Sequence, residues 1–188
     1  MRTIEQYDKV IQQCTSVFIN KMMDYGLSWR ILRPSSLTDQ IFIKASRIRS
    51  LEEKKTSKIN EGVEPEYIGI INYSIMSIIQ LKFPYKGGPT IDNENMKDIY
   101  KTEFNMAKDL MNNKNHDYDE AWRGMRISSL TDIILQKLLR IKQIEDNDGL
   151  TKVSEGLEAN YYDIINYSVF ALIKISEKKE SPNNDLQI

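Results

Sequence analysis

The residues best suited to chemistry are a group of acids and an amide in the last third of the chain. Glu155 and Glu158 stand where an apolar segment begins, and Asp163 and Asn166 follow within it. Their oxygens could form a run of ligands for a hard cation such as Mg²⁺, which usually keeps waters and substrate phosphates as its remaining ligands. In the structural alternative, the glutamates oppose a helix dipole and Asp163 pairs with Lys137.

Two lysine–arginine pairs form a second candidate group. At 100° per residue, Lys137 falls on the apolar stripe of its predicted helix and Arg140 on the margin of that stripe, and Lys44 and Arg47 repeat this placement. A lysine on a core-facing stripe must extend to solvent, pair with a carboxylate or hold an anion. A bound phosphate and an internal ion pair both satisfy this pattern.

A third group combines aromatic residues with arginines: Tyr118, Trp122, Arg123 and Arg126. The planar arginine fork suits phosphate, and tryptophan and tyrosine can stack on a nucleotide base. In the alternative, the tryptophan anchors a connection in the core and the arginines cover it. The G-x-G-x-x-G and P-loop patterns are missing, so a nucleotide would not be held in the Rossmann or Walker manner.

These candidates belong to a sequence that occurs twice. Residues 24–48 (DYGLSWRILRPSSLTDQIFIKASRI) match residues 117–141 (DYDEAWRGMRISSLTDIILQKLLRI), and residues 61–74 match residues 155–168. An internal repeat of about 90 residues fixes the architecture. The copies differ at one chemically important place, where Asp163 corresponds to Gly69. This difference predicts a function centred on the second copy.

Each copy must position these residues with three helices. Apolar residues recur at helical spacing, S-x-x-D sequences at Ser36 and Ser129 have the form of helix N-caps, and the third segment of each copy is apolar almost all round. Helices are expected over residues 3–23, 36–53, 65–81, 94–113, 129–146 and 159–176. The predicted fold is an all-α bundle of two tandem three-helix repeats, whose second and third helices form a pseudo-two-fold four-helix core.

The predicted organisation is one compact domain. Residues 1–82 form the first repeat, residues 83–93 a linker rich in proline and glycine, residues 94–176 the second repeat and residues 177–188 a flexible tail. The net charge of −1 and pI near 6.0 argue against extended nucleic acid as a partner. No apolar run suits a membrane span, and the polar start lacks a signal peptide, so we expect a cytoplasmic protein. A homodimer stays an open alternative.

The motif string as a whole resembles a known family. It reads K-N-x-D-Y, W-R, R-x-S-S-L-T-D, K, R-I, E-G and N-Y-x-D-I-I-N-Y, at residues 114–115, 117–118, 122–123, 126, 128–132, 137, 140–141, 155–156 and 160–167. This string is similar to the family called nucleotide-modification-associated domain one, once listed as a domain of unknown function. The resemblance implies a phage or bacterial protein that serves nucleotide or DNA-base modification.

A more distant resemblance is to the all-α nucleoside triphosphate pyrophosphatases of the MazG and dimeric dUTPase type, which hold Mg²⁺ with acidic residues on paired helices. It implies that Mg²⁺ bound by Glu155, Glu158 and Asp163 activates water and clamps phosphate oxygens, with Asp163 and Glu158 as catalytic groups. The nucleotide would be bound by a wider set of residues: Lys44, Arg47, Tyr118, Trp122, Arg123, Arg126, Lys137, Arg140 and Asn166. The alternative is a non-catalytic nucleotide-binding or assembly module of a base-modification system.

Overall fold

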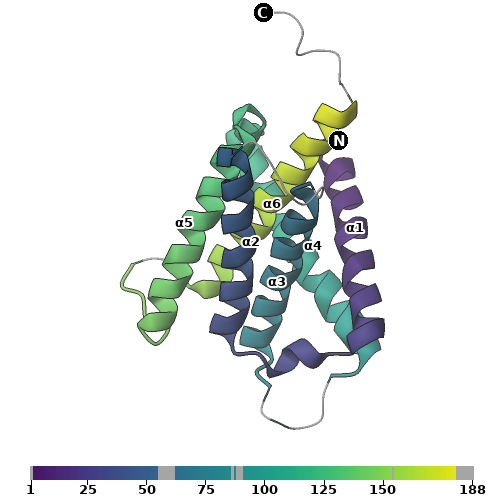
Figure 1. The fold of residues 1–188 in the computed structure, drawn as a ribbon, viewed down its shortest axis with the longest axis vertical. Coiled ribbons are helices and arrows are strands. Elements are labelled where there is room, and N and C mark those ends of the chain that lie inside the picture. Colours follow the sequence, from purple (N-terminus) through teal and green to yellow (C-terminus); the bar gives the residue numbers. More distant parts are fainter. Residues whose placement is uncertain (1, 55–61, 86, 88–90, 154, 181–188) are drawn as a thin grey trace, which may run out of the picture.

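The computed structural model describes residues 2–54, 62–85, 87, 91–153 and 155–180 of the chain. This part contains six α-helices, two short 3₁₀ helices and no strand (Figure 1). In chain order the elements are α1 (Arg2–Tyr25), η1 (Ser28–Ile31), α2 (Pro34–Lys54), α3 (Glu64–Lys82), α4 (Asn93–Tyr118), η2 (Ala121–Gly124), α5 (Ile127–Asp146) and α6 (Leu157–Glu180). The all-α prediction and the repeated order of three helices per copy are confirmed.

The helices pack in three layers of two. The central pair, α3 and α6, lies between α2 and α5 on one side and α1 and α4 on the other (Figure 1). Because neighbours cover both sides of α3 and α6, these helices bury residues around most of their circumference. This position explains their nearly continuous apolar sequence. The predicted four-helix core is the set α2, α3, α5 and α6, in which each helix packs on two of the others.

Reciprocal hydrogen bonds tie the outer helices to the central pair. Tyr7 on α1 donates to Asn166 of the other repeat at 2.6 Å, and Tyr100 on α4 donates to Asn72 at 2.7 Å. Each asparagine also donates to a backbone carbonyl of its own repeat, at Cys14 for Asn72 and at an alanine for Asn166. Both buried asparagines are therefore hydrogen-bonded through the oxygen and the nitrogen of the amide, and the bonds follow a two-fold pattern.

The threonines of the two S-S-L-T-D motifs make a second reciprocal network. The Thr38 hydroxyl lies 2.7 Å from the Tyr161 hydroxyl and donates to Glu145 at 2.7 Å. In the other half, Thr131 lies 2.8 Å from the Tyr67 hydroxyl and donates to a glutamate of the first repeat, Glu52. Burial raises the pKa of both glutamates, and the threonine hydrogen bonds offset only part of that rise.

Several predicted boundaries are wrong. Ser36 and Ser129 do not cap helices, because α2 begins earlier, at Pro34, and α5 begins at Ile127 after an uncapped Arg126. Proline suits a first helical turn because that position needs no amide hydrogen bond. At the other end, α6 continues to Glu180, beyond the start of the predicted tail at residue 177. Residues 181–188, and residues 86 and 88–90 of the predicted linker, lie outside the described residues.

Candidate functional site

Each repeat encloses a cleft between its first helix, its 3₁₀ helix and its third helix. The first cleft has a volume of about 370 Å³ and is lined by Phe18, Lys21, Met22, Tyr25, Gly26, Ser28, Trp29, Leu32, Tyr73 and Met76. The second cleft has a volume of about 410 Å³ and is lined by Met111, Lys114, Asn115, Ala121, Trp122, Met125, Asp163, Asn166, Tyr167 and Phe170. Both volumes fall within the range of small-molecule sites.

The two clefts are the same structure built twice. In the repeated sequence, Lys21 corresponds to Lys114, and the clefts share a tryptophan on the 3₁₀ helix and a tyrosine on the third helix. A large apolar residue lies one helical turn after that tyrosine: Met76 in the first cleft and Phe170 in the second. Each repeat therefore places one amine beside an aromatic wall.

In the second cleft the amine of Lys114 already pairs with an acid of the protein itself. Asp163 is only 6% exposed and accepts hydrogen bonds from Lys137 at 2.6 Å and from Lys114 at 2.7 Å. Burial lowers the pKa of Lys114, but the hydrogen bond to Asp163 and the nearby negative charges together outweigh burial, and the pKa is raised. The structural alternative for Asp163, a pairing with Lys137, is what the structure contains, with a second lysine added. Lys137 lies on the apolar stripe and is largely buried, with its side chain 13% exposed.

In the first repeat the third helix carries its acid one helical turn earlier than in the second repeat. Lys44 donates to Glu66 at 3.1 Å, and Arg47 pairs with the same carboxylate. The counterpart of Glu66 is Asn160, and the counterpart of Asp163 is Gly69. The Lys44 side chain crosses Gly69 so closely that a Cβ added there would lie 2.7 Å from Lys44 Cε. Glycine at this position thus makes room for the path of Lys44 to Glu66.

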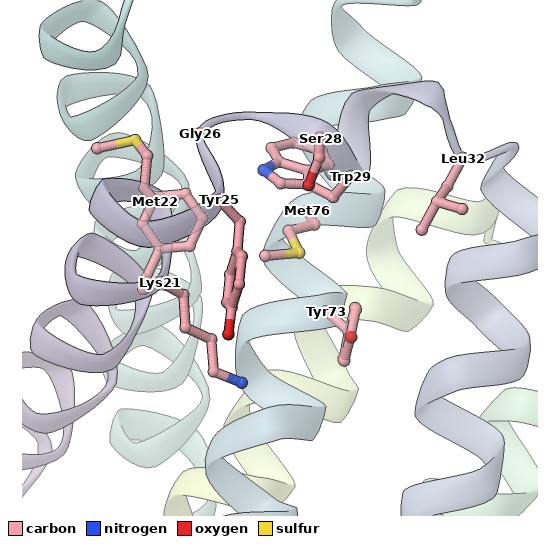
Figure 2. Close-up of a pocket in the computed structure, with 10 residues that line it drawn as sticks. Lys21, Met22, Tyr25, Gly26, Ser28, Trp29, Leu32, Tyr73 and Met76 are labelled. Atoms are coloured by element: carbon pink, nitrogen blue, oxygen red, sulfur yellow. The ribbon is translucent and has the colours of Figure 1, made fainter.

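The amine of the first cleft has no acid beside it. Lys21 is exposed and forms no ion pair or hydrogen bond within the described part of the chain. Figure 2 shows Lys21 and Tyr25 extending from the end of α1 toward α3, from which Met76 points toward Tyr25. Tyr73, also on α3, lines the same cleft. Tyr25 is 71% exposed, so its ring is open to a ligand.

The tryptophan–arginine pairs are structural anchors. Trp122 stacks on Phe170 at 4.2 Å between ring centroids, and the guanidinium of Arg123 lies 4.4 Å from the other face. Both faces of the indole are covered, so Trp122 does not offer the base-stacking surface that we predicted. In the first repeat, Arg30 lies 5.4 Å from the Trp29 ring. The indole Nε1 atoms of Trp29 and Trp122 are buried without an acceptor among the described residues.

The arginines predicted to bind phosphate either pair with other side chains or lie outside the two clefts. Arg123 bonds to Gln6 at 2.9 Å and to Glu177 at 3.1 Å, which ties η2 to α1 and α6. Arg126 is exposed and lines neither cleft. Arg140 lines a separate surface hollow beside the end of α5. The side chain of Tyr118 lies outside the described residues.

The predicted magnesium ligands are not brought together. Glu158 pairs with Lys82 at 2.9 Å, Asp163 pairs with lysines, and Glu155 lines the same surface hollow as Arg140. Among the residues that the structure describes, no three acidic, histidine or cysteine side chains are placed to hold a metal ion. These donors do not fit Mg²⁺, which prefers several oxygen ligands in octahedral geometry.

Fold and clefts together define an all-α protein in which a duplicated helical unit builds the same ligand-sized cleft twice. The chain belongs to the nucleotide modification associated domain 1 family, whose sequence model matches residues 21–81 and again residues 114–175. Each match begins at the lysine of a cleft. No curated protein and no solved structure matches the chain. None of the helices that the structure describes is long and apolar enough to cross a membrane.

Sequence reasoning missed the first cleft. Lys21, Tyr25 and Tyr73 were not among the predicted ligand contacts, although all three recur in the second copy. The usable signal was the identity of Lys21 and Lys114, one helical turn before the repeated Asp-Tyr pair. That signal becomes informative only when the third helix is known to face these lysines.

Proposed function

We propose that the protein binds a nucleotide in the course of nucleotide or DNA-base modification and that the cleft of its first repeat is the binding site. The observation that carries this proposal is the lysine of the first cleft beside two tyrosines, Lys21 with Tyr25 and Tyr73, in the first of the two segments that the family model matches. A lysine amine binds phosphate as a point charge. A tyrosine ring offers the flat surface on which a base stacks, whatever the base.

The first cleft illustrates how such a ligand would be held. Lys21 approaches from α1 and would pair with phosphate, while the ring of Tyr25 and the side chains of Tyr73 and Met76 line the space beside it. Methionine adapts its shape and makes favourable contacts with aromatic rings. Phe18 and Met22 are buried and close the inner wall. These residues bind and orient a ligand without requiring a metal.

A binding module fits the structure better than the magnesium-dependent pyrophosphohydrolase. The hydrolase hypothesis depends on Glu155, Glu158 and Asp163. Glu158 and Asp163 pair with different lysines, and Glu155 lines a separate surface hollow. Neither cleft is lined by two acids that could share a metal and activate water. Non-catalytic binding, as a component of a modification system, needs only the clefts.

Thermal unfolding with a nucleotide panel tests this proposal. Nucleosides, nucleoside monophosphates and nucleoside triphosphates are added separately, each with and without Mg²⁺. We expect phosphorylated ligands to raise the Tm in a concentration-dependent way, equally well without the metal. The proposal fails if no nucleotide raises the Tm. A shift that requires Mg²⁺ and is accompanied by pyrophosphate release would instead support the hydrolase.

A further inference from the structure

We infer that the two clefts are not equivalent: the first binds the phosphate of a nucleoside monophosphate at Lys21, and Asp163 takes the place of that phosphate in the second. The identity of the ligand rests on the proposed function. The asymmetry rests on the charges that the two repeats place beside the same amine.

The second cleft already contains its anion. Asp163 lies within hydrogen-bond distance of Lys114 and Lys137, so both amines already donate to one carboxylate. That carboxylate is buried, and a phosphate entering the second cleft would meet its negative charge at short range, where a poorly hydrated site screens little. The pairing therefore supports the structure of the second repeat and disfavours an anionic ligand there.

The first cleft has the amine but lacks the acid. Gly69 carries no side chain, and Lys44 and Arg47 converge on Glu66 instead. An anionic ligand in this cleft would pair with Lys21. The hydroxyl-bearing residues Ser28, Tyr25 and Tyr73 line the same cleft. In Figure 2 the Lys21 amine ends beside α3.

The charge of the first cleft also indicates the class of ligand. One lysine lines it, and neither an arginine nor a second lysine does so. A triphosphate would need several cations or a bridging metal for its charge, whereas a single phosphate is matched by one amine and neighbouring hydroxyl donors. The cleft volume of about 370 Å³ suits a ligand of nucleotide size rather than a polymer.

Calorimetric titration of the full chain with a nucleoside monophosphate panel tests this inference through matched variants. Lys21→Gln and Lys114→Gln remove equivalent amines from the two clefts. We expect the wild-type protein to bind one ligand per chain, Lys21→Gln to weaken binding by 10-fold or more (~10-fold per 1.4 kcal/mol), and Lys114→Gln to leave affinity within about 2-fold. Inorganic phosphate should compete for the same site.

A second pair of variants moves the acid. Gly69→Asp adds a carboxylate at the position that corresponds to Asp163 and should abolish phosphate-dependent binding by supplying Lys21 with an internal anion. The flexible end of Lys44, which lies against Gly69, can shift to admit the new side chain. Gly69→Asn adds the same volume without charge and is the control for a steric effect. Asp163→Asn frees Lys114 and should add a second, weaker site. Melting curves show that each variant is folded.

The outcomes separate the two proposals. Two equal sites in the wild-type protein, or a loss of affinity in Lys114→Gln but not in Lys21→Gln, would overturn the asymmetry while the nucleotide-binding function stands. Equal loss in Gly69→Asp and Gly69→Asn would also contradict it, since the effect would then be steric. Absence of nucleotide binding by the wild-type protein and every variant would overturn the proposed function itself.

Discussion

The first and second clefts share their helices, their lysine and their aromatic wall, and they differ in where a single carboxylate sits. In the second repeat it is Asp163, facing Lys114 and Lys137, and in the first it is Glu66, facing Lys44 and Arg47 one turn earlier. In both repeats the acid pairs with the equivalent lysine of the second helix, Lys137 or Lys44. Moving the acid by one turn changes its second partner from the cleft lysine Lys114 to Arg47. A duplicated scaffold can in this way keep one copy for stability and leave the other for a ligand.

The largest stability difference between the repeats should follow removal of these acids. Asp163→Asn leaves two amines without a carboxylate, one of them largely buried, and should lower the free energy of unfolding by about 2–3 kcal/mol. Glu66→Gln should cost less, about 1 kcal/mol, because Lys44 and Arg47 are more exposed and can reach water. Chemical denaturation of both variants checks the order.

This comparison also decides the role of Asp163. Had Asp163 bound a metal or oriented water, Asp163→Asn would remove activity or magnesium-dependent nucleotide binding and leave the stability unchanged. A variant as stable as the wild-type protein, or one less affected than Glu66→Gln, would contradict the ion-pair role assigned here.

Smaller and equal effects are expected where the repeats are alike. Tyr7→Phe removes the donor to Asn166, and Tyr100→Phe removes the donor to Asn72. Each leaves a buried amide oxygen unpaired and should cost about 1–2 kcal/mol. Thermal or urea unfolding of the two variants measures the difference between them. If the two costs differ by more than about 1 kcal/mol, hydrogen bonds that are equivalent in the two repeats do not contribute equally to stability.

The smallest effect concerns pH. Because burial raises the pKa of Glu52 and Glu145 in the folded state, that state holds their protons more tightly than the unfolded chain does. These two groups therefore make stability fall as the pH rises from the ordinary carboxyl pKa of 4.5 toward the raised values. Glu52→Gln and Glu145→Gln should each flatten this decline by a similar amount.

Stability curves measured at a series of pH values check that expectation. The comparison is the difference between each variant and the wild-type protein, since other carboxylates such as Glu120 and Glu177 have lowered pKa values and contribute with the opposite sign. A steeper decline in either variant would contradict the assignment.

Much of the fold could be predicted from the sequence because the repeat and the helical periodicity report the same arrangement. The continuous apolar character of α3 and α6 required a central position, and the apolar-stripe lysines required solvent, a carboxylate or an anion at their amines. The caps were wrong because an S-x-x-D sequence is a local signal, whereas helix α2 begins where Pro34 fixes the backbone.

The site was harder to predict, because its residues come from three elements in each repeat. Spacing along one helix could suggest that Glu158 and Asp163 act together, but it could not show that Glu158 pairs with Lys82 of the first repeat. Nor could it show that Trp122 is covered on both faces by Phe170 and Arg123. Such partners depend on packing between segments far apart in the sequence.

The most direct test of the asymmetry is the reactivity of the two cleft lysines. Brief acetylation of the protein, followed by mass spectrometry of its peptides, compares Lys21 with Lys114 in the absence and presence of a nucleoside monophosphate. We expect Lys21 to react readily and to be protected by the ligand, and Lys114 to react slowly under both conditions because Asp163 holds its amine. Protection of Lys114, or of neither lysine at saturating ligand, would contradict the central claim.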